Sequence, residues 1–336
     1  MPKILSHKIT PPKPFTLRQF YEKRNTVLIV RAAGGLGDIL MHRMIFENFK
    51  RVMPECRLIF ALPEMYFPAV IDHPHIDQIL NCKSVSVQDY LIWYDTTYNC
   101  HRYESAKAPF SDKHRSDIWA NHCGLKLETH NMNIRFTSKE RAFGEELVGS
   151  HCNGKKTVAF CPISAMTVKN LLMHQQKAAV DYLRSQGLTV LGLHDRPVAE
   201  LEALKVPVLT GLTIRQWMSI LNAVDYVVSV DSAAFHFAGG IRKPLTGIFT
   251  AFDGKVYGKY YKFNLVQLHR DNGNWDCGPC YDWGGCPKST KHPKPCLTEL
   301  TGEMITDGIR RMLDGNVNKS RTLPVLNRFE YSETIG

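Results

Sequence analysis

A strand passes directly into a helix in the stretch Tyr226-Val-Val-Ser-Val-Asp-Ser-Ala-Ala-Phe-His-Phe-Ala-Gly-Gly240. Its first residues are mostly apolar and β-branched, which predicts a buried strand. Two residues of helix-capping type and two alanines follow, so a helix should begin there. The free N–H groups and positive dipole end of such a helix can hold a diphosphate. We therefore expect a diphosphate site formed by Asp231, Ser232, Ala233 and Ala234.

His236 lies about one turn into the same helix. Its ring could donate a hydrogen bond to phosphates or to a ribose. A single histidine on a helix is more often structural, so both interpretations stay open.

The first half of the chain has the same order of strand, turn and helix. An apolar run, Thr26–Val30, leads into the turn Arg31-Ala-Ala-Gly-Gly-Leu-Gly-Asp38, and a helical periodicity begins at Asp38. A second apolar run follows at Arg57–Leu62. The pattern predicts a βαβ unit with parallel strands.

Asp38 ends the glycine turn, whose glycines are Gly34, Gly35 and Gly37. It could serve only as a helix cap. A dinucleotide-binding turn is a second interpretation, but the third glycine of the G-x-G-x-x-G pattern is missing. A carboxylate at the edge of such a turn also suits a general base that deprotonates an acceptor hydroxyl.

The second half repeats the alternation and predicts a second doubly wound domain. Between the halves, the stretch from Ile79 to about Asn133 shows no clear pattern beyond a strand near Tyr90–Tyr94. We expect strands at Thr157–Cys161, Leu188–Leu193 and Leu245–Thr250, and helices at Ser138–Leu147, Leu171–Ser185, Val198–Leu204 and Ile214–Ala223.

Composition limits the class of protein. With 44% hydrophobic and 22% charged residues, the 336-residue chain is of globular type and long enough for two domains. No run is long enough to span a membrane and no signal peptide begins the chain, so we expect a cytoplasmic protein, with peripheral membrane contact left open. The net charge of +10 favours anionic partners, although a solvated basic surface would give the same figure.

Four of the ten cysteines are clustered at Cys277, Cys280, Cys286 and Cys296. This spacing can present four thiolates to zinc or iron, and the closed set suggests a structural metal. Free thiols are the alternative, and His292 is a possible substitute ligand.

Three elements together resemble the ADP-heptose glycosyltransferases, family 9, which include the lipopolysaccharide heptosyltransferases. They are the glycine turn ending at Asp38, the loop Ser164-Ala-Met-Thr-Val-Lys169, and the segment from Asp231 to His236. The resemblance covers roughly residues 26 to 315. It implies an α/β fold of GT-B architecture, with two Rossmann-like domains facing a cleft, and an inverting reaction without a catalytic metal or other cofactor.

The resemblance also assigns roles to residues. Asp38 matches the base, and Lys169 matches a lysine beside the donor phosphates. The donor-binding turn reads Asp-Ser-Ala-Ala-Phe-His where the family more usually has Asp-Ser-Gly-Pro-Met-His, and Thr250-Ala-Phe-Asp253 replaces a Gly-Pro-Thr-Asp loop. The donor-binding residues implied are Ser164, Lys169, Asp231, Ser232, Ala233, Ala234, His236 and Asp253.

The resemblance implies the domain plan as well. We expect an N-terminal arm at 1–24, an acceptor domain at 25–150, a nucleotide-sugar domain at 151–315 with a Cys-rich insertion at 275–297, and a tail at 316–336. The basic residues of the arm favour an anionic acceptor.

The expected activity is transfer of a heptose or related sugar from a nucleotide-diphosphate sugar such as ADP-heptose. The expected acceptor is a lipopolysaccharide-type glycan, with a protein or a hydroxymethylated DNA base as alternatives. Two alternatives belong to other functional classes: a nucleotide-dependent oxidoreductase and a non-catalytic nucleic-acid-binding protein.

Overall fold

The structure is a computed structural model that describes residues 24–108, 111–268, 280–281, 286 and 288–315. Its first sheet is parallel and four-stranded, in the order β3-β2-β1-β4. The central strands β1 and β2 are buried on both faces and are near-continuous apolar runs, whereas β3 and β4 at the sheet edges are only partly buried. The strands are β1 (Thr26–Val30), β2 (Arg57–Leu62), β3 (Gln78–Asn81) and β4 (Ile92–Asp95).

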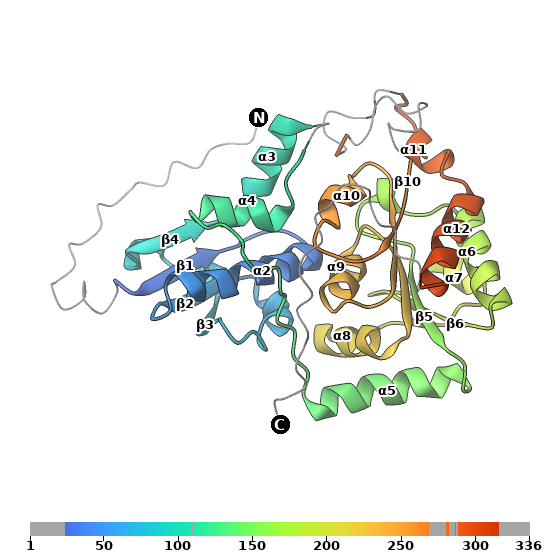
Figure 1. The fold of residues 1–336 in the computed structure, drawn as a ribbon, viewed down its shortest axis with the longest axis horizontal. Helices are drawn as coiled ribbons and strands as arrows, with labels where there is room; N and C mark the ends of the chain where they lie inside the picture. Colours follow the sequence, from blue (N-terminus) through green and yellow to red (C-terminus); the bar gives the residue numbers. More distant parts are fainter. Residues whose placement is uncertain (1–23, 109–110, 269–279, 282–285, 287, 316–336) are drawn as a thin grey trace.

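The second sheet is parallel and six-stranded, in the order β10-β9-β8-β5-β6-β7. Helices cover both sheets, so each half is a doubly wound α/β unit (Figure 1). The strands are β5 (Thr157–Cys161), β6 (Thr189–Leu193), β7 (Val208–Leu209), β8 (Tyr226–Val230), β9 (Leu245–Phe249) and β10 (Asn264–Gln267).

The helices of the first half are α2 (Leu36–Val52), α3 (Asn99–Lys107) and α4 (Arg115–His122). Those of the rest are α5 (Ser138–Cys152), α6 (Met173–Ser185), α7 (Ala199–Ala203), α8 (Ile214–Ala223), α9 (Ala233–Gly240), α10 (Gly254–Tyr257), α11 (Pro295–Thr298) and α12 (Gly302–Leu313). The predicted strands and helices of both halves are confirmed, with ends that differ by a few residues.

The strand expected near Tyr90–Tyr94 is confirmed as β4. The rest of the stretch between Ile79 and Asn133 is more regular than its sequence indicates, because it also contains most of β3 and the helices α3 and α4. The buried side of α3 includes Cys100 and the carboxylate of Glu104, so it lacks the apolar spacing that identifies a helix in a sequence.

The halves meet where the helix α2 packs against α9. The connecting helix α5 packs against α8 of the second half. At Gly144 in α5 an added Cβ would lie 2.3 Å from the carbonyl oxygen of Ser219 in α8, so only glycine permits this approach. The domain boundary expected at residue 150 falls inside α5. The expected arm at 1–24, except Arg24, and the tail at 316–336 lie outside the described residues.

Candidate active site

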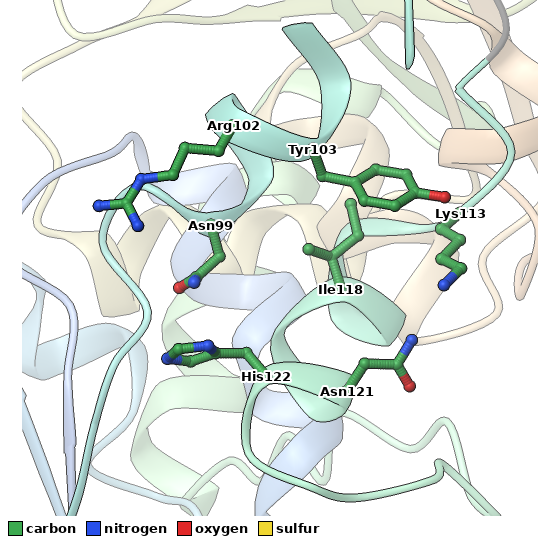
Figure 2. Close-up of a pocket in the computed structure, with 7 residues that line it drawn as sticks. All are labelled: Asn99, Arg102, Tyr103, Lys113, Ile118, Asn121 and His122. Atoms are coloured by element: carbon green, nitrogen blue, oxygen red, sulfur yellow. The ribbon is translucent and has the colours of Figure 1, made fainter. Parts of the chain in front are cut away.

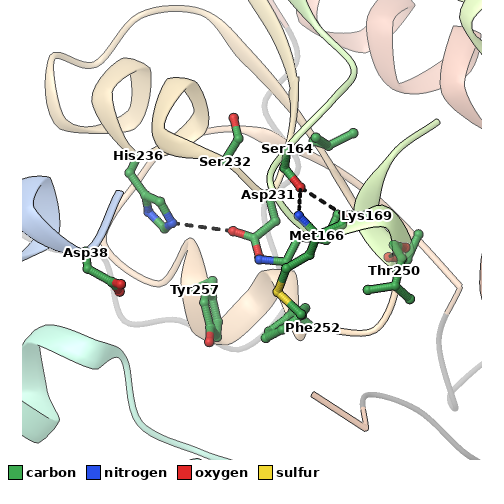
Figure 3. Close-up of polar contacts among 12 residues, drawn as sticks. Asp38, Ser164, Met166, Lys169, Asp231, Ser232, His236, Thr250, Phe252 and Tyr257 are labelled. Atoms are coloured by element: carbon green, nitrogen blue, oxygen red, sulfur yellow. Dashed lines mark hydrogen bonds and ion pairs between the residues drawn. The ribbon is translucent and has the colours of Figure 1, made fainter. Parts of the chain in front are cut away.

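The start of α2 meets the start of α9, although the two lie almost 200 residues apart in the sequence. A Cβ added at Gly37 would lie 3.1 Å from Cδ2 of His236 and 3.5 Å from Cα of Ala233. Glycine at this position therefore allows the two turns predicted to carry chemistry to approach each other. Figure 3 shows Asp38 beside His236 and the residues that follow β8.

Asp38 lies in the first turn of α2 and is held by two arginines. Its Oδ1 is 2.6 Å from Nη1 of Arg115, and its Oδ2 is 3.2 Å from Nη2 of Arg31. The same Oδ2 accepts a hydrogen bond from the N–H of Gly35 at 3.1 Å, so Asp38 also caps the helix. The helix-cap interpretation is thus correct, and it does not conflict with the prediction of a base.

The charges around Asp38 decide its protonation. Burial by itself raises the pKa of Asp38, but Arg115 and Arg31, with the hydrogen bonds from Arg115 and Gly35, lower it to about 2. The carboxylate is therefore ionised at neutral pH and free to accept a proton. It is also a weak base for as long as both arginines hold it.

Arg115 is itself held by a second carboxylate. Its Nε and Nη2 each donate to Glu104 at 2.8 Å, in a bidentate pair with a carboxylate that is fully buried. The hydroxyl of Tyr257, from α10 in the second half, donates to Oε1 of Glu104 at 2.9 Å. The guanidinium of Arg115 lies over the Tyr257 ring, 5.1 Å from its centroid. The second half is thereby connected to Asp38 through the buried Glu104 and the half-buried Arg115.

No local pattern in the sequence points to Glu104, Arg115 or Tyr257. The hydrogen bond from Tyr257 to Glu104 joins residues 153 positions apart. Local spacing gives no signal for such a pair, and only the missed helices α3 and α4 would have pointed to it.

Ser232 caps α9, as predicted. Its Oγ accepts a hydrogen bond from the N–H of Ala234 at 3.2 Å, and the remaining N–H groups of the first turn lack partners within the helix. Ser229 Oγ is 3.0 Å from Ser232 Oγ and fixes the cap. The helix start therefore has the geometry that the sequence predicts, and anion binding there stays a prediction.

Asp231 does not cap the helix but contacts Lys169 and His236. Its Oδ2 is 2.7 Å from Nζ of Lys169 and its Oδ1 is 3.5 Å from Nε2 of His236 (Figure 3). Burial raises the pKa of Asp231, and Lys169 and His236 outweigh it and hold that pKa well below its usual range. The ammonium of Lys169 also lies 4.0 Å from the centroid of the Phe252 ring.

His236 has protein partners on both sides of its ring. Its Nδ1 is 3.2 Å from the hydroxyl of Tyr261, and Nε2 faces Asp231. The structural interpretation of His236 therefore has direct support, and contact with a ligand stays a prediction.

Two further predicted donor residues order their own loops. Ser164 Oγ donates to the carbonyl of Met166 at 3.1 Å, and the N–H of Ser164 donates to Asn170. Asp253 caps α10 by accepting from the N–H of Lys255 at 2.8 Å. Their contact with a donor stays a prediction.

The predicted metal site lies partly outside the described residues, because Cys277 is not among them. Cys280, Cys286 and Cys296 are described, and each is half-buried. In the part of the chain that the structure describes, no three histidine, cysteine or acidic side chains gather as a metal site would require. The described residues thus give the metal no support, and His292 joins no such group.

Comparison with known proteins supplies the class of enzyme. The model of glycosyltransferase family 9 (heptosyltransferase) matches residues 113–277. The chain carries a family 9 glycosyltransferase domain. No curated protein matches the sequence. The glycosyltransferase expectation is confirmed, and the domain includes Lys169 and the turn after β8.

Solved structures show the same GT-B fold at low sequence identity. A family 9 glycosyltransferase from Veillonella parvula has a TM-score of 0.64 and 14% identity, over 87% of this chain and 98% of that one. ADP-heptose lipopolysaccharide heptosyltransferase II of E. coli has a TM-score of 0.56 and 11% identity, over 86% and 99%. The iron-containing heptosyltransferase TibC of E. coli, in complex with ADP-D-β-D-heptose, has a TM-score of 0.61 and 15% identity, over 87% of this chain and 78% of that one. Within the described residues, no helix of this glycosyltransferase has the length and hydrophobicity to cross a membrane.

Proposed function

We propose that this glycosyltransferase moves a heptose or a related sugar from a nucleotide-diphosphate sugar to an anionic acceptor, with inversion and without a catalytic metal. The observation that carries the proposal is the contact between the start of α2, which holds Asp38, and the start of α9. The carboxylate of Asp38 and the turn proposed to bind an anion, at the start of α9, therefore lie close to each other. That arrangement suits a base on one reactant and phosphates on the other.

The donor phosphates would lie at the start of α9, where Ser232 and Ala234 present the helix terminus. Negative charge on the leaving nucleoside diphosphate grows as the glycosidic bond breaks, so positive groups at this point stabilise the transition state. Lys169 is placed to supply such a charge in the role that a metal ion has elsewhere. It is engaged by Asp231, and the incoming phosphate would have to share its ammonium group. The ADP-sugar complex of TibC supports an ADP-linked donor.

Asp38 would accept the proton of the acceptor hydroxyl. The hydroxyl oxygen forms a bond to the anomeric carbon, the bond to the diphosphate breaks, and its electron pair leaves with the nucleotide. A single displacement of this kind inverts the anomeric centre. Because the arginines keep the pKa of Asp38 at about 2, proton acceptance requires at least one of their contacts to weaken when the acceptor enters.

A lipopolysaccharide-type glycan is the proposed acceptor. It agrees with the net charge of +10, and heptosyltransferase II of E. coli, which shares the fold, is named as a lipopolysaccharide enzyme. A protein or a hydroxymethylated DNA base remains the alternative. The incomplete glycine pattern counts against an oxidoreductase.

A structural zinc or iron at the four cysteines is a separate part of the proposal. Its support is the spacing of Cys277, Cys280, Cys286 and Cys296, together with the iron-containing character of TibC.

The test is a donor panel. The full chain is mixed with ADP-heptose, UDP- and GDP-sugars, with and without lipopolysaccharide core, and the free nucleotide is measured by mass spectrometry. We expect release from one nucleotide sugar, increased by acceptor, and a marked loss in Lys169→Ala. Lys177→Ala is the matched control, because Lys177 forms an exposed ion pair with Asp181. Oxidation of a nicotinamide in place of sugar transfer would overturn the proposal.

A further inference from the structure

A pocket of about 430 Å³ lies between α3 and α4. Arg102 from α3, Lys113 from the loop before α4, and His122 from the end of α4 line it (Figure 2). The lining includes no carboxylate. The pocket therefore gathers two long cationic side chains and an imidazole, and the nearby carboxylate of Asp112 is engaged by the hydroxyl of Tyr103. It lies in the half of the protein to which the acceptor is assigned.

The other lining residues are of the kinds that bind sugars. Tyr103 offers an aromatic ring, Asn121 an amide and Ile118 an apolar floor. The ring is fixed, because the hydroxyl of Tyr103 donates to Asp112 at 2.5 Å. Lys113 places its ammonium 5.2 Å from the centroid of this ring.

His122 is also held in place. With the amide of Asn99 turned to satisfy its neighbours, the amide oxygen accepts a hydrogen bond from Nδ1 of His122 at 3.2 Å. This contact leaves Nε2 as the ring nitrogen that Asn99 does not engage. The pocket thus has a fixed imidazole, a fixed aromatic ring and two longer cationic side chains.

The pocket is connected to the transfer site through its own helices. On α3, Tyr103 immediately precedes Glu104, the carboxylate that holds Arg115. On α4, Ile118 stands one turn beyond Arg115, which contacts Asp38. The two helices that form the pocket therefore also position the proposed base.

We propose that the pocket between α3 and α4 binds a phosphate-bearing sugar of the acceptor. This inference rests on the proposed function and adds the place where the acceptor's charge is recognised. The volume falls in the range of small-molecule sites, about 300–1,000 Å³, and suits a sugar ring with one phosphate. Duplex DNA is the less suitable occupant, because it is bound over extended basic surfaces that follow its backbone.

The test combines direct binding with kinetics. The variant Arg102→Ala/Lys113→Ala is compared with Arg57→Ala/Lys83→Ala, which removes the same charge from residues that begin β2 and follow β3. Binding of mannose 6-phosphate and of mannose to the full chain is measured by saturation-transfer NMR. We expect mannose 6-phosphate to bind the wild type and the control variant equally well. It should bind the pocket variant at least fivefold more weakly, and mannose should bind none of the three proteins.

In transfer assays the KM for phosphorylated lipopolysaccharide core should rise about tenfold in the pocket variant, with kcat retained and the dephosphorylated core unaffected. Equal effects of the pocket and control pairs would overturn the inference, as would a pocket variant that binds the phosphosugar like wild type. Selective loss of duplex DNA binding would assign the pocket to nucleic acid instead. Hydrolysis of the nucleotide sugar without acceptor tests the proposed function independently of the pocket. If the wild type hydrolyses the donor but the pocket variant behaves like the control, only the pocket inference is wrong.

Discussion

The hydroxyl of Tyr257 donates a hydrogen bond to the buried carboxylate of Glu104 at 2.9 Å and so joins the two halves of the protein beside the proposed base. Glu104 in turn holds Arg115, whose remaining nitrogen contacts Asp38 at 2.6 Å. Removing the hydroxyl leaves Glu104 with one donor fewer. Tyr257→Phe should therefore lower turnover about three- to tenfold through a less well positioned Asp38.

The matched control is Tyr260→Phe. The Tyr260 hydroxyl also crosses between the halves and donates to Asp117 at 2.7 Å, but this contact does not lead to Asp38. Both variants should unfold at lower denaturant concentration than wild type, and only Tyr257→Phe should lose turnover. If both lose turnover to the same degree, the Tyr257 contact is merely part of the interface.

Arg115→Gln should change the pH dependence of activity. Arg115 helps to hold the pKa of Asp38 at about 2, below its ordinary 3.8, so the variant's Asp38 pKa should rise toward 3.8. A lowered pKa gives stability that is present above the unfolded value and is lost as pH falls through the folded value; here that window runs from about 4 down to 2. The variant should lose up to about 2 kcal/mol of this contribution.

The measurement is kcat/KM from about pH 7 down to the lowest pH at which circular dichroism shows folded protein, because both acid limbs are expected below about pH 4. The variant's acid limb should lie at higher pH than that of the wild type. Superimposable acid limbs would show that Arg115 does not set the protonation of the base.

Gly37→Ala should disturb the contact between the two helix starts. Its Cβ would lie 3.1 Å from Cδ2 of His236, so the histidine must move away from Asp231. We expect turnover to fall about tenfold and stability by about 1–3 kcal/mol. Gly35→Ala is the control in the same turn, since nothing lies within 4 Å of its Cβ. A Gly37→Ala variant as active as Gly35→Ala would mean that the site does not depend on this approach.

The cysteine prediction is tested by metal analysis. Purified full-length protein should contain about one zinc or iron per chain, because four thiolates at this spacing form a closed site. Cys280→Ser should lose the metal and lower the melting temperature, whereas Cys56→Ser, a buried free thiol of the first half, should keep the metal. If the purified wild-type protein contains no metal and has normal stability, the four cysteines do not form a structural metal site.

The sequence was sufficient for the elements that local pattern defines. Buried parallel strands such as Tyr226–Val230 are mostly apolar, and the start of α9 is marked by a serine cap. The side chains that surround Asp38 could not be predicted from local sequence pattern. Glu104 and Arg115 are polar residues whose burial depends on each other and on Tyr257, so their helices look like a surface stretch until the long-range contacts are formed.

Asp231 shows the same limit within a correctly predicted turn. Its type and position suggest a helix cap, and Ser232 takes that role. The contacts of Asp231 with Lys169 and His236 follow from the packing of the loop after β5 against the turn after β8. No spacing rule connects these two segments.

The role of Asp38 as the base is measured in the substitution Asp38→Asn, which keeps the shape of the side chain and removes the base. Turnover of the nucleotide sugar in the presence of acceptor should fall about 100-fold or more, while the Kd for nucleoside diphosphate, measured by calorimetry, should stay within about threefold of wild type. Glu47→Gln on the same helix should leave both unchanged. Undiminished turnover in Asp38→Asn would contradict the account, and Asp38 would then only cap α2.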